Sequence, residues 1–166
     1  MLYILDSNIL IYPNRTTHPF DIHPTFWEKM SSILNRDNIE SIDKVKSEIY
    51  NHEDDLTNWC KSNIYNEFWN SSTNSIAEYA EIQNWAQTKD YNDRALADFA
   101  NHTNADPFLA SFALQAKRNS QNITIVTLEI SSPDSKRIIK LPDVCIEFGI
   151  RYIDLNDFFR EINAKF

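Results

Sequence analysis

The chain alternates between short continuous apolar runs and longer stretches in which apolar residues recur at helical spacing. Apolar runs at 1–5, 39–42 and 122–127 predict strands, and a further strand is expected near 150–153. The first run ends in Asp-Ser-Asn at residues 6–8, which is typical of a turn after a strand.

Helices are expected where apolar residues recur every three to four positions. They are predicted over 24–35, 54–63, 75–89 and 92–100, after Asp43, from Asp106, and from Leu155 to Ile162. Asp43 and Asp106 are expected to be N-cap residues, and Ser75 with Glu78 matches a capping box. The polar segment 63–74 is expected to be a loop.

Short strands separated by helices predict an α/β fold with a central, mostly parallel sheet covered by helices on both faces. No repeat, low-complexity tract or linker interrupts the chain, so residues 1–166 are expected to form a single domain. No apolar run approaches the roughly 20 residues of a membrane span. The N-terminus resembles no signal peptide, so we expect a cytoplasmic protein with no membrane contact.

Composition excludes several large enzyme classes. Gly149 is the one glycine, which rules out the glycine-rich dinucleotide and phosphate loops and the GxSxG nucleophile elbow. An HExxH zinc motif is absent as well. The two cysteines, Cys60 and Cys145, lie far apart and are expected to be buried thiols.

The charge balance is acidic: 16 Lys and Arg against 24 Asp and Glu give a net charge of −8. A protein that binds nucleic acid by electrostatics alone is usually basic. The balance does not argue against a nuclease whose metal ions supply local positive charge.

Four acidic residues are expected at the carboxyl edge of the predicted sheet, where ligands bind in such folds. Asp6 follows the first strand, and Glu129 follows the strand at 122–127. Asp106 opens the helix that leads into that strand, and Glu48 lies on the core-facing stripe of the helix after the second strand. Converging carboxylates repel one another unless a hard cation such as Mg²⁺ or Mn²⁺ joins them. Each acid also has an ordinary interpretation as a turn residue, helix cap, helix-edge residue or solvated loop residue, and the residues alone leave both open.

Four segments resemble the motifs of the PIN (PilT N-terminus) domain family, in the order in which that family has them. They are residues 3–12, 41–48, 104–110 and 126–129. Residues 19–27 are similar to an uncharacterised bacterial branch of PIN proteins, which is itself similar to the VapC toxins of toxin–antitoxin pairs.

The resemblance implies a three-layer α/β/α sandwich and a Mg²⁺- or Mn²⁺-dependent endonuclease that hydrolyses RNA by in-line attack of water on phosphorus. The metal ligands that it implies are Asp6, Glu48, Asp106 and Glu129. Asn8 and Thr127 would orient carboxylates or substrate. Glu129 stands where the family more often has aspartate, and its longer arm puts a second metal site in question.

Five basic residues between positions 117 and 140 are the candidates for contacts with RNA phosphates. They are Lys136, Arg137 and Lys140, with Lys117 and Arg118. The ordinary interpretation is a solvated loop and helix end.

By resemblance, a cognate antitoxin protein would cover the acidic cleft, and the chain would form a homodimer. The alternative is a catalytically idle PIN-like interaction module that binds a protein partner without cutting RNA. Binding of Mg²⁺ or Mn²⁺ to the folded chain distinguishes the two hypotheses, because the nuclease is expected to be stabilised by the metal and the interaction module is not.

Overall fold

The computed structural model describes all 166 residues and contains a five-stranded sheet in which every pair of neighbouring strands is parallel. The strands follow the order β3-β2-β1-β4-β5. Their bounds are Leu2–Leu5 (β1), Ile39–Ile42 (β2), Trp69–Asn70 (β3), Ile123–Val126 (β4) and Arg151–Ile153 (β5). The predicted α/β class with a parallel sheet is confirmed.

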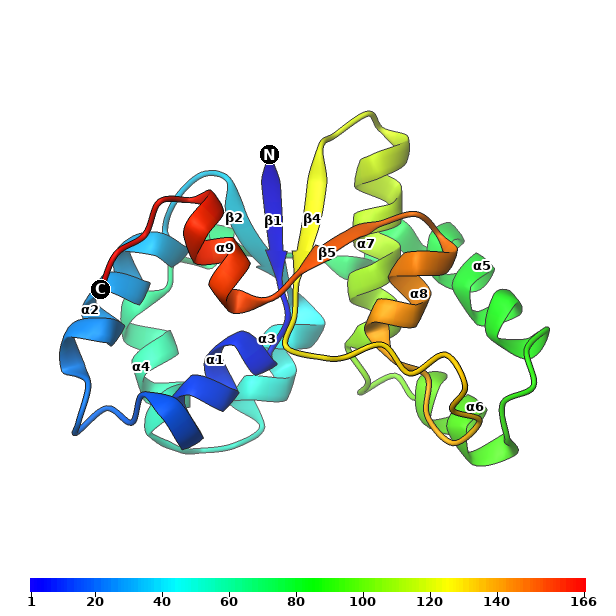
Figure 1. Cartoon of the computed structure of the whole chain (residues 1–166), viewed down its shortest axis with the longest axis horizontal. Helices are drawn as coiled ribbons and strands as arrows, with labels where there is room; N and C mark the ends of the chain where they lie inside the picture. The colour runs from blue at the N-terminus through cyan, green and yellow to red at the C-terminus, as the bar shows by residue number, and fades with distance from the viewer.

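Helices cover both faces of the sheet and complete three layers (Figure 1). Their bounds are Asn8–Tyr12 (α1), Pro24–Leu34 (α2), Asp43–Tyr50 (α3), Asp55–Asn63 (α4), Ile76–Gln87 (α5), Asp93–Phe99 (α6), Asp106–Arg118 (α7), Leu141–Glu147 (α8) and Leu155–Glu161 (α9). Helices α1, α2, α4 and α9 lie on one side of the sheet, and α5 to α8 lie on the other (Figure 1). None of the helices combines the length and apolar character needed to cross a membrane.

The register of the central strands brings distant residues to one edge of the sheet. Leu5 pairs with Val126 at the carboxyl ends of β1 and β4. The next amide in the chain, that of Asp6, donates to the Val126 carbonyl at 3.0 Å. Asp6 and Thr127, which directly follow these two adjacent strands, therefore lie side by side.

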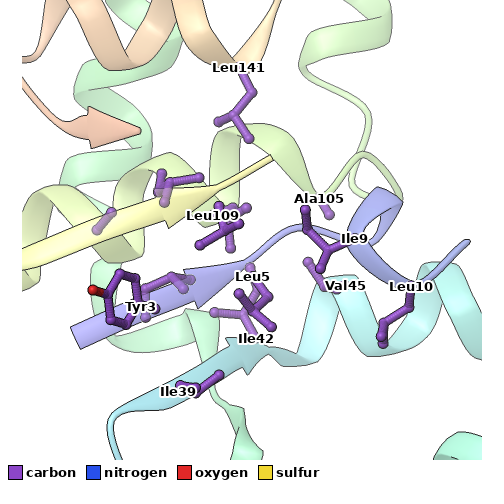
Figure 2. Close-up of a cluster of buried hydrophobic side chains, with 14 of the residues drawn as sticks. Tyr3, Leu5, Ile9, Leu10, Ile39, Ile42, Val45, Ala105, Leu109 and Leu141 are labelled. Carbon is purple, nitrogen blue, oxygen red and sulfur yellow. The ribbon is translucent and has the colours of Figure 1, made fainter. Parts of the chain in front are cut away.

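A cluster of 37 buried hydrophobic residues fixes the elements that surround this edge. Figure 2 shows Leu5, Ile9, Val45 and Ala105 among the clustered side chains of this core. Leu5 directly precedes Asp6, Ala105 directly precedes Asp106, and Val45 lies one turn before Glu48. The backbone positions of the acids at the edge are thus fixed by closely packed neighbouring residues.

Two capping predictions are wrong because tertiary partners take the polar groups. The Asp43 carboxylate accepts a hydrogen bond from the backbone N–H of Ser72 at 3.2 Å, and Asp43 is the first residue of α3 rather than its cap. Ser75 occupies the N-cap position of α5 but makes no capping hydrogen bond, because its hydroxyl contacts the Ser72 carbonyl at 3.1 Å and the Ser111 hydroxyl at 3.3 Å. Glu78, the other residue of the predicted capping box, pairs with Arg118. Local sequence rules do not include such long-range partners.

The elements that were not predicted are α1, the two-residue edge strand β3, α8, a π-helical turn at Pro13–Thr17 and 3-10 turns at Asn66–Phe68 and Ser72–Ser75. The segment 63–74, expected to be a loop, thus contains short regular structure. Helix α8 carries Pro142 in its first turn and ends at Glu147. Gly149 follows two residues later, and its positive φ of 60° suits the one glycine in the chain. The N–H of Ile150 then donates to the Cys145 carbonyl at 2.8 Å and closes the helix end. Both cysteines are buried and free, as predicted.

The core beneath the site predicts a stability contrast between two isoleucines on helices. Ile49 on α3 is 1 % exposed and Ile146 on α8 is 60 % exposed. Ile49→Ala should lower the free energy of unfolding by about 3 kcal/mol, because it leaves a cavity in the core. Ile146→Ala should change it by less than roughly 0.5 kcal/mol. Urea unfolding followed by circular dichroism measures both, and similar losses would contradict this description of the core.

Candidate metal centre at the carboxyl edge of the sheet

Asp6 is buried, with 4 % of its surface exposed, and its carboxylate is held on both oxygens. Oδ1 accepts the backbone N–H of Ser7 at 2.6 Å. Oδ2 accepts hydrogen bonds from the Asn8 amide at 2.6 Å and from the Thr127 hydroxyl at 2.7 Å. These contacts fix the orientation of a carboxylate that follows the central strand.

Asn8 and Thr127 connect the turn after β1 to the turn after β4. The Asn8 side-chain amide also donates to the Thr127 hydroxyl at 3.1 Å, and its carbonyl accepts the backbone N–H of Leu128 at 3.0 Å. The Thr127 hydroxyl accepts the N–H of Glu129 at 3.1 Å. Both residues therefore make the contacts that a role in orienting Asp6 requires.

Glu48 and Asp106 approach the same edge from two helices. Glu48 Oε1 accepts the backbone N–H of Ala105 at 3.0 Å, which ties α3 to the start of α7. Asp106 is the first residue of α7 and Ala105 occupies the cap position, so the predicted N-cap role of Asp106 is wrong. The Asp106 N–H donates to the Asn104 side chain at 3.0 Å, whereas its partly exposed carboxylate accepts no hydrogen bond from the protein.

Burial and mutual repulsion raise the pKa values of two acids in this group. Burial, followed by the charges of Glu48 and Glu129, raises the pKa of Asp6 to about 6 against the opposing hydrogen bond from Thr127. Burial, together with the charges of Asp6, Glu129 and Glu48, raises the pKa of Asp106 well above its ordinary value. Acids from four distant stretches thus lie close enough for their charges to raise the pKa values of Asp6 and Asp106.

The acids form an open group rather than a closed coordination shell. No three Asp, Glu, His or Cys side chains come close enough together to hold an ion between them directly. Mg²⁺ keeps several of its waters and binds through one or two carboxylates, so it does not need a closed protein cage. Oxygen-only donors, an unbonded Asp106 carboxylate and a local excess of negative charge fit a hard divalent cation that retains waters.

Glu129 differs from the other three acids, because a cationic side chain pairs with its carboxylate. Oε1 pairs with the Lys140 ammonium at 3.1 Å, and Oε2 accepts the N–H of Leu141 at 3.0 Å. Its carboxylate therefore lies at the first turn of α8. Sequence reasoning missed this partnership, because Lys140 was considered only as a contact for phosphate.

Most of the candidate basic side chains are already held by protein groups. Those that form ion pairs or donate to backbone carbonyls are Lys117, Arg118, Lys136 and Lys140. Lys136, for example, pairs with Asp90. Arg137 is the exception, since its guanidinium has no partner in the protein.

Arg137 also lies beside the acidic group. It lines a hollow of about 140 Å³ together with Asp106, Asn104 and Phe99. A second, open hollow of about 480 Å³ shares Arg137 and continues to Arg94 at the start of α6. A free cationic group thus stands next to the acid whose carboxylate is unbonded.

Cys145 lies near the acids but has no reactive character. Burial and the charges of Asp106, Asp6 and Asp143 raise the pKa of its thiol, which therefore stays protonated. A thiolate nucleophile is excluded at this position.

The fold and the site define an α/β sandwich with an acidic group at the carboxyl edge of its parallel sheet. Residues 3–166 match the family described as "Domain of unknown function (DUF4411)", and the chain therefore belongs to that family. None of the curated proteins compared with the chain matches it. Its fold is similar to that of a chain in the crystal structure of VapBC2 from Rickettsia felis bound to a DNA fragment from their promoter. That similarity has a TM-score of 0.52 and 16 % identity, and it covers 93 % of this chain and 98 % of the other.

The raised pKa of Asp6 predicts how stability depends on pH when metal is removed by EDTA. The folded state holds the Asp6 proton more firmly than the unfolded state, whose pKa is near 3.8. Stability should therefore fall as the pH rises from about 3.8 to about 6. Asp6 should contribute roughly 3 kcal/mol over this whole range, about half of which is lost between pH 5 and pH 7.5. Asp6→Asn, which cannot ionise, should lose that contribution.

Urea unfolding of the wild type and Asp6→Asn at pH 5 and pH 7.5 measures the difference. Comparing the two proteins removes the pH dependence of the groups that do not interact with Asp6. An equal decline in both proteins would contradict the strained state of Asp6.

Proposed function

We propose that the chain is a Mg²⁺- or Mn²⁺-dependent endoribonuclease that hydrolyses RNA phosphodiesters in the cytoplasm, as the toxin of a type II toxin–antitoxin pair. The observation that carries the proposal is the unbonded Asp106 carboxylate, held among other acids that raise its pKa. Such an arrangement is costly in the folded protein unless a cation relieves the repulsion. Resemblance to the PIN motifs supplies the reaction class.

In this proposal Asp6, Glu48 and Asp106 surround the metal, which one or two of them would bind directly and the others through its waters. A bound divalent cation lowers the pKa of water and stabilises charge on the phosphodiester. Asn8 and Thr127 keep the Asp6 carboxylate aimed at the site through their 2.6 and 2.7 Å hydrogen bonds. The open edge leaves room for water and for the scissile phosphate.

Arg137 is the residue best suited to bind an RNA phosphate. Its guanidinium is free, it is exposed, and it lines the hollow beside Asp106. Lys136 was predicted to share this role, but it also pairs with Asp90. Arginine binds phosphate oxygens through two parallel hydrogen bonds, which would fix the substrate next to the acids.

An antitoxin is the partner that this proposal requires. The similar fold in VapBC2 from Rickettsia felis, a structure that contains a promoter DNA fragment, supports a partner of that kind. Homodimerisation stays a prediction by family resemblance.

A catalytically idle interaction module is the second candidate. The open spacing of the acids favours it, because no three of them enclose an ion. The nuclease proposal requires that a few millimolar Mn²⁺ raise the melting temperature of EDTA-stripped protein, since binding to the folded state stabilises it. An unchanged melting temperature would favour the interaction module.

Asp106→Asn should reduce Mn²⁺-dependent cleavage of total RNA by at least about a hundredfold, because it removes a charged ligand of the metal. The fold without metal should be as stable as the wild type or more so, because one repelling charge is gone. Asp55→Asn is the matched control, since Asp55 is the exposed first residue of α4 on the opposite side of the sheet.

Cleavage is followed on gels with Mn²⁺ against EDTA, and stability by urea unfolding in EDTA. Full activity in Asp106→Asn would overturn the proposal. A large loss of stability without metal would show instead that Asp106 is a structural residue.

Arg137→Gln should weaken RNA binding roughly tenfold, because a charged contact with phosphate is lost. Lys136→Gln should weaken it less than about twofold, since its charge pairs with Asp90. Fluorescence anisotropy with a labelled RNA and cleavage-inactive Asp106→Asn protein measures both. Equal effects of the two substitutions would contradict the special position of Arg137.

A further inference from the structure

Glu129, the fourth acid of the group, forms an ion pair with Lys140. The pair is largely shielded from water, with 27 % of the Lys140 side chain and 21 % of the Glu129 side chain exposed. Its 3.1 Å separation is that of a hydrogen-bonded ion pair. Both residues lie in the loop between β4 and α8.

The Lys140 ammonium offsets part of the negative charge of the four acids through its ion pair with Glu129. Asp6, Glu48 and Asp106 form no ion pair with a basic side chain of the protein.

The protein donors to Asp6 are neutral, whereas a metal at Glu129 would have to bind beside the Lys140 ammonium, which already pairs with that carboxylate. Oε2 of Glu129 also accepts the N–H of Leu141. The Leu141 amide belongs to the first turn of α8, and the Leu141 side chain is fully buried in the core. Moving this backbone would disturb packed residues, so the arrangement resists conversion into a metal site.

We infer that Lys140 is a built-in counter-ion that takes the place of a second divalent cation, and that Glu129 positions Lys140 and α8 rather than binding metal. The site then holds one divalent cation, at Asp6, Glu48 and Asp106. This inference rests on the proposed function, and it revises the role that family resemblance gave to Glu129.

The test is the number of Mn²⁺ ions bound, measured by isothermal titration on EDTA-stripped protein at pH 7. The wild type should bind one Mn²⁺. Glu129→Gln keeps an acceptor for the Leu141 N–H and should bind Mn²⁺ within about threefold of the wild-type affinity. Asp106→Asn should bind it at least roughly tenfold more weakly.

Lys140→Met tests the counter-ion directly. Without the ammonium, the carboxylate of Glu129 becomes free, and a second, weaker Mn²⁺ should bind. The double variant Lys140→Met/Glu129→Gln should lose that second ion and keep the first. Circular dichroism and melting temperatures in EDTA confirm that each variant is folded before titration.

The outcomes separate this inference from the proposed function. Two Mn²⁺ ions on the wild type, a loss of affinity in Glu129→Gln as large as in Asp106→Asn, or no second ion on Lys140→Met would overturn the inference alone. No Mn²⁺ on the wild type would overturn both.

Discussion

Repulsion among partly buried carboxylates at the carboxyl edge of the sheet is the constraint on which the site depends. The parallel register of β1 and β4 sets Asp6 beside Thr127, and the start of α7 brings in Asp106. Packed neighbours such as Leu5 and Ala105, both almost fully buried, hold the acids in place. Since the backbone cannot relax, the strain appears as raised pKa values and is relieved by protons or by a cation.

The acidic composition of the chain is consistent with such a site once the positive charges are located. Of the candidate basic side chains, Lys117 and Arg118 lie at the end of α7 remote from Asp106, and Lys136 pairs with Asp90. Arg137 stays free beside Asp106, and Lys140 is fixed at Glu129. An RNA substrate would thus meet a few placed cations rather than a basic surface, which makes a metal ion the main source of attraction.

Periodicity and turn residues predicted the parallel strands around Asp6 and most of the helices, because these depend on local patterns of burial. The sequence could not tell that Asp106 is the first residue of α7 with a free carboxylate, since Asp-Pro suits an ordinary cap equally well. Glu129 was misleading for a related reason: its partners, Lys140 and Leu141, lie 11 and 12 residues away. Helix α8 had a usable signal, with Pro142 near its start and Gly149 after its end.

Anomalous diffraction from crystals soaked in Mn²⁺ tests the central claim most directly. We predict one anomalous peak beside the carboxylates of Asp6 and Asp106, with Lys140 still paired to Glu129. Crystals in which no manganese binds at this edge, or in which these two carboxylates point to separate surfaces, would contradict it.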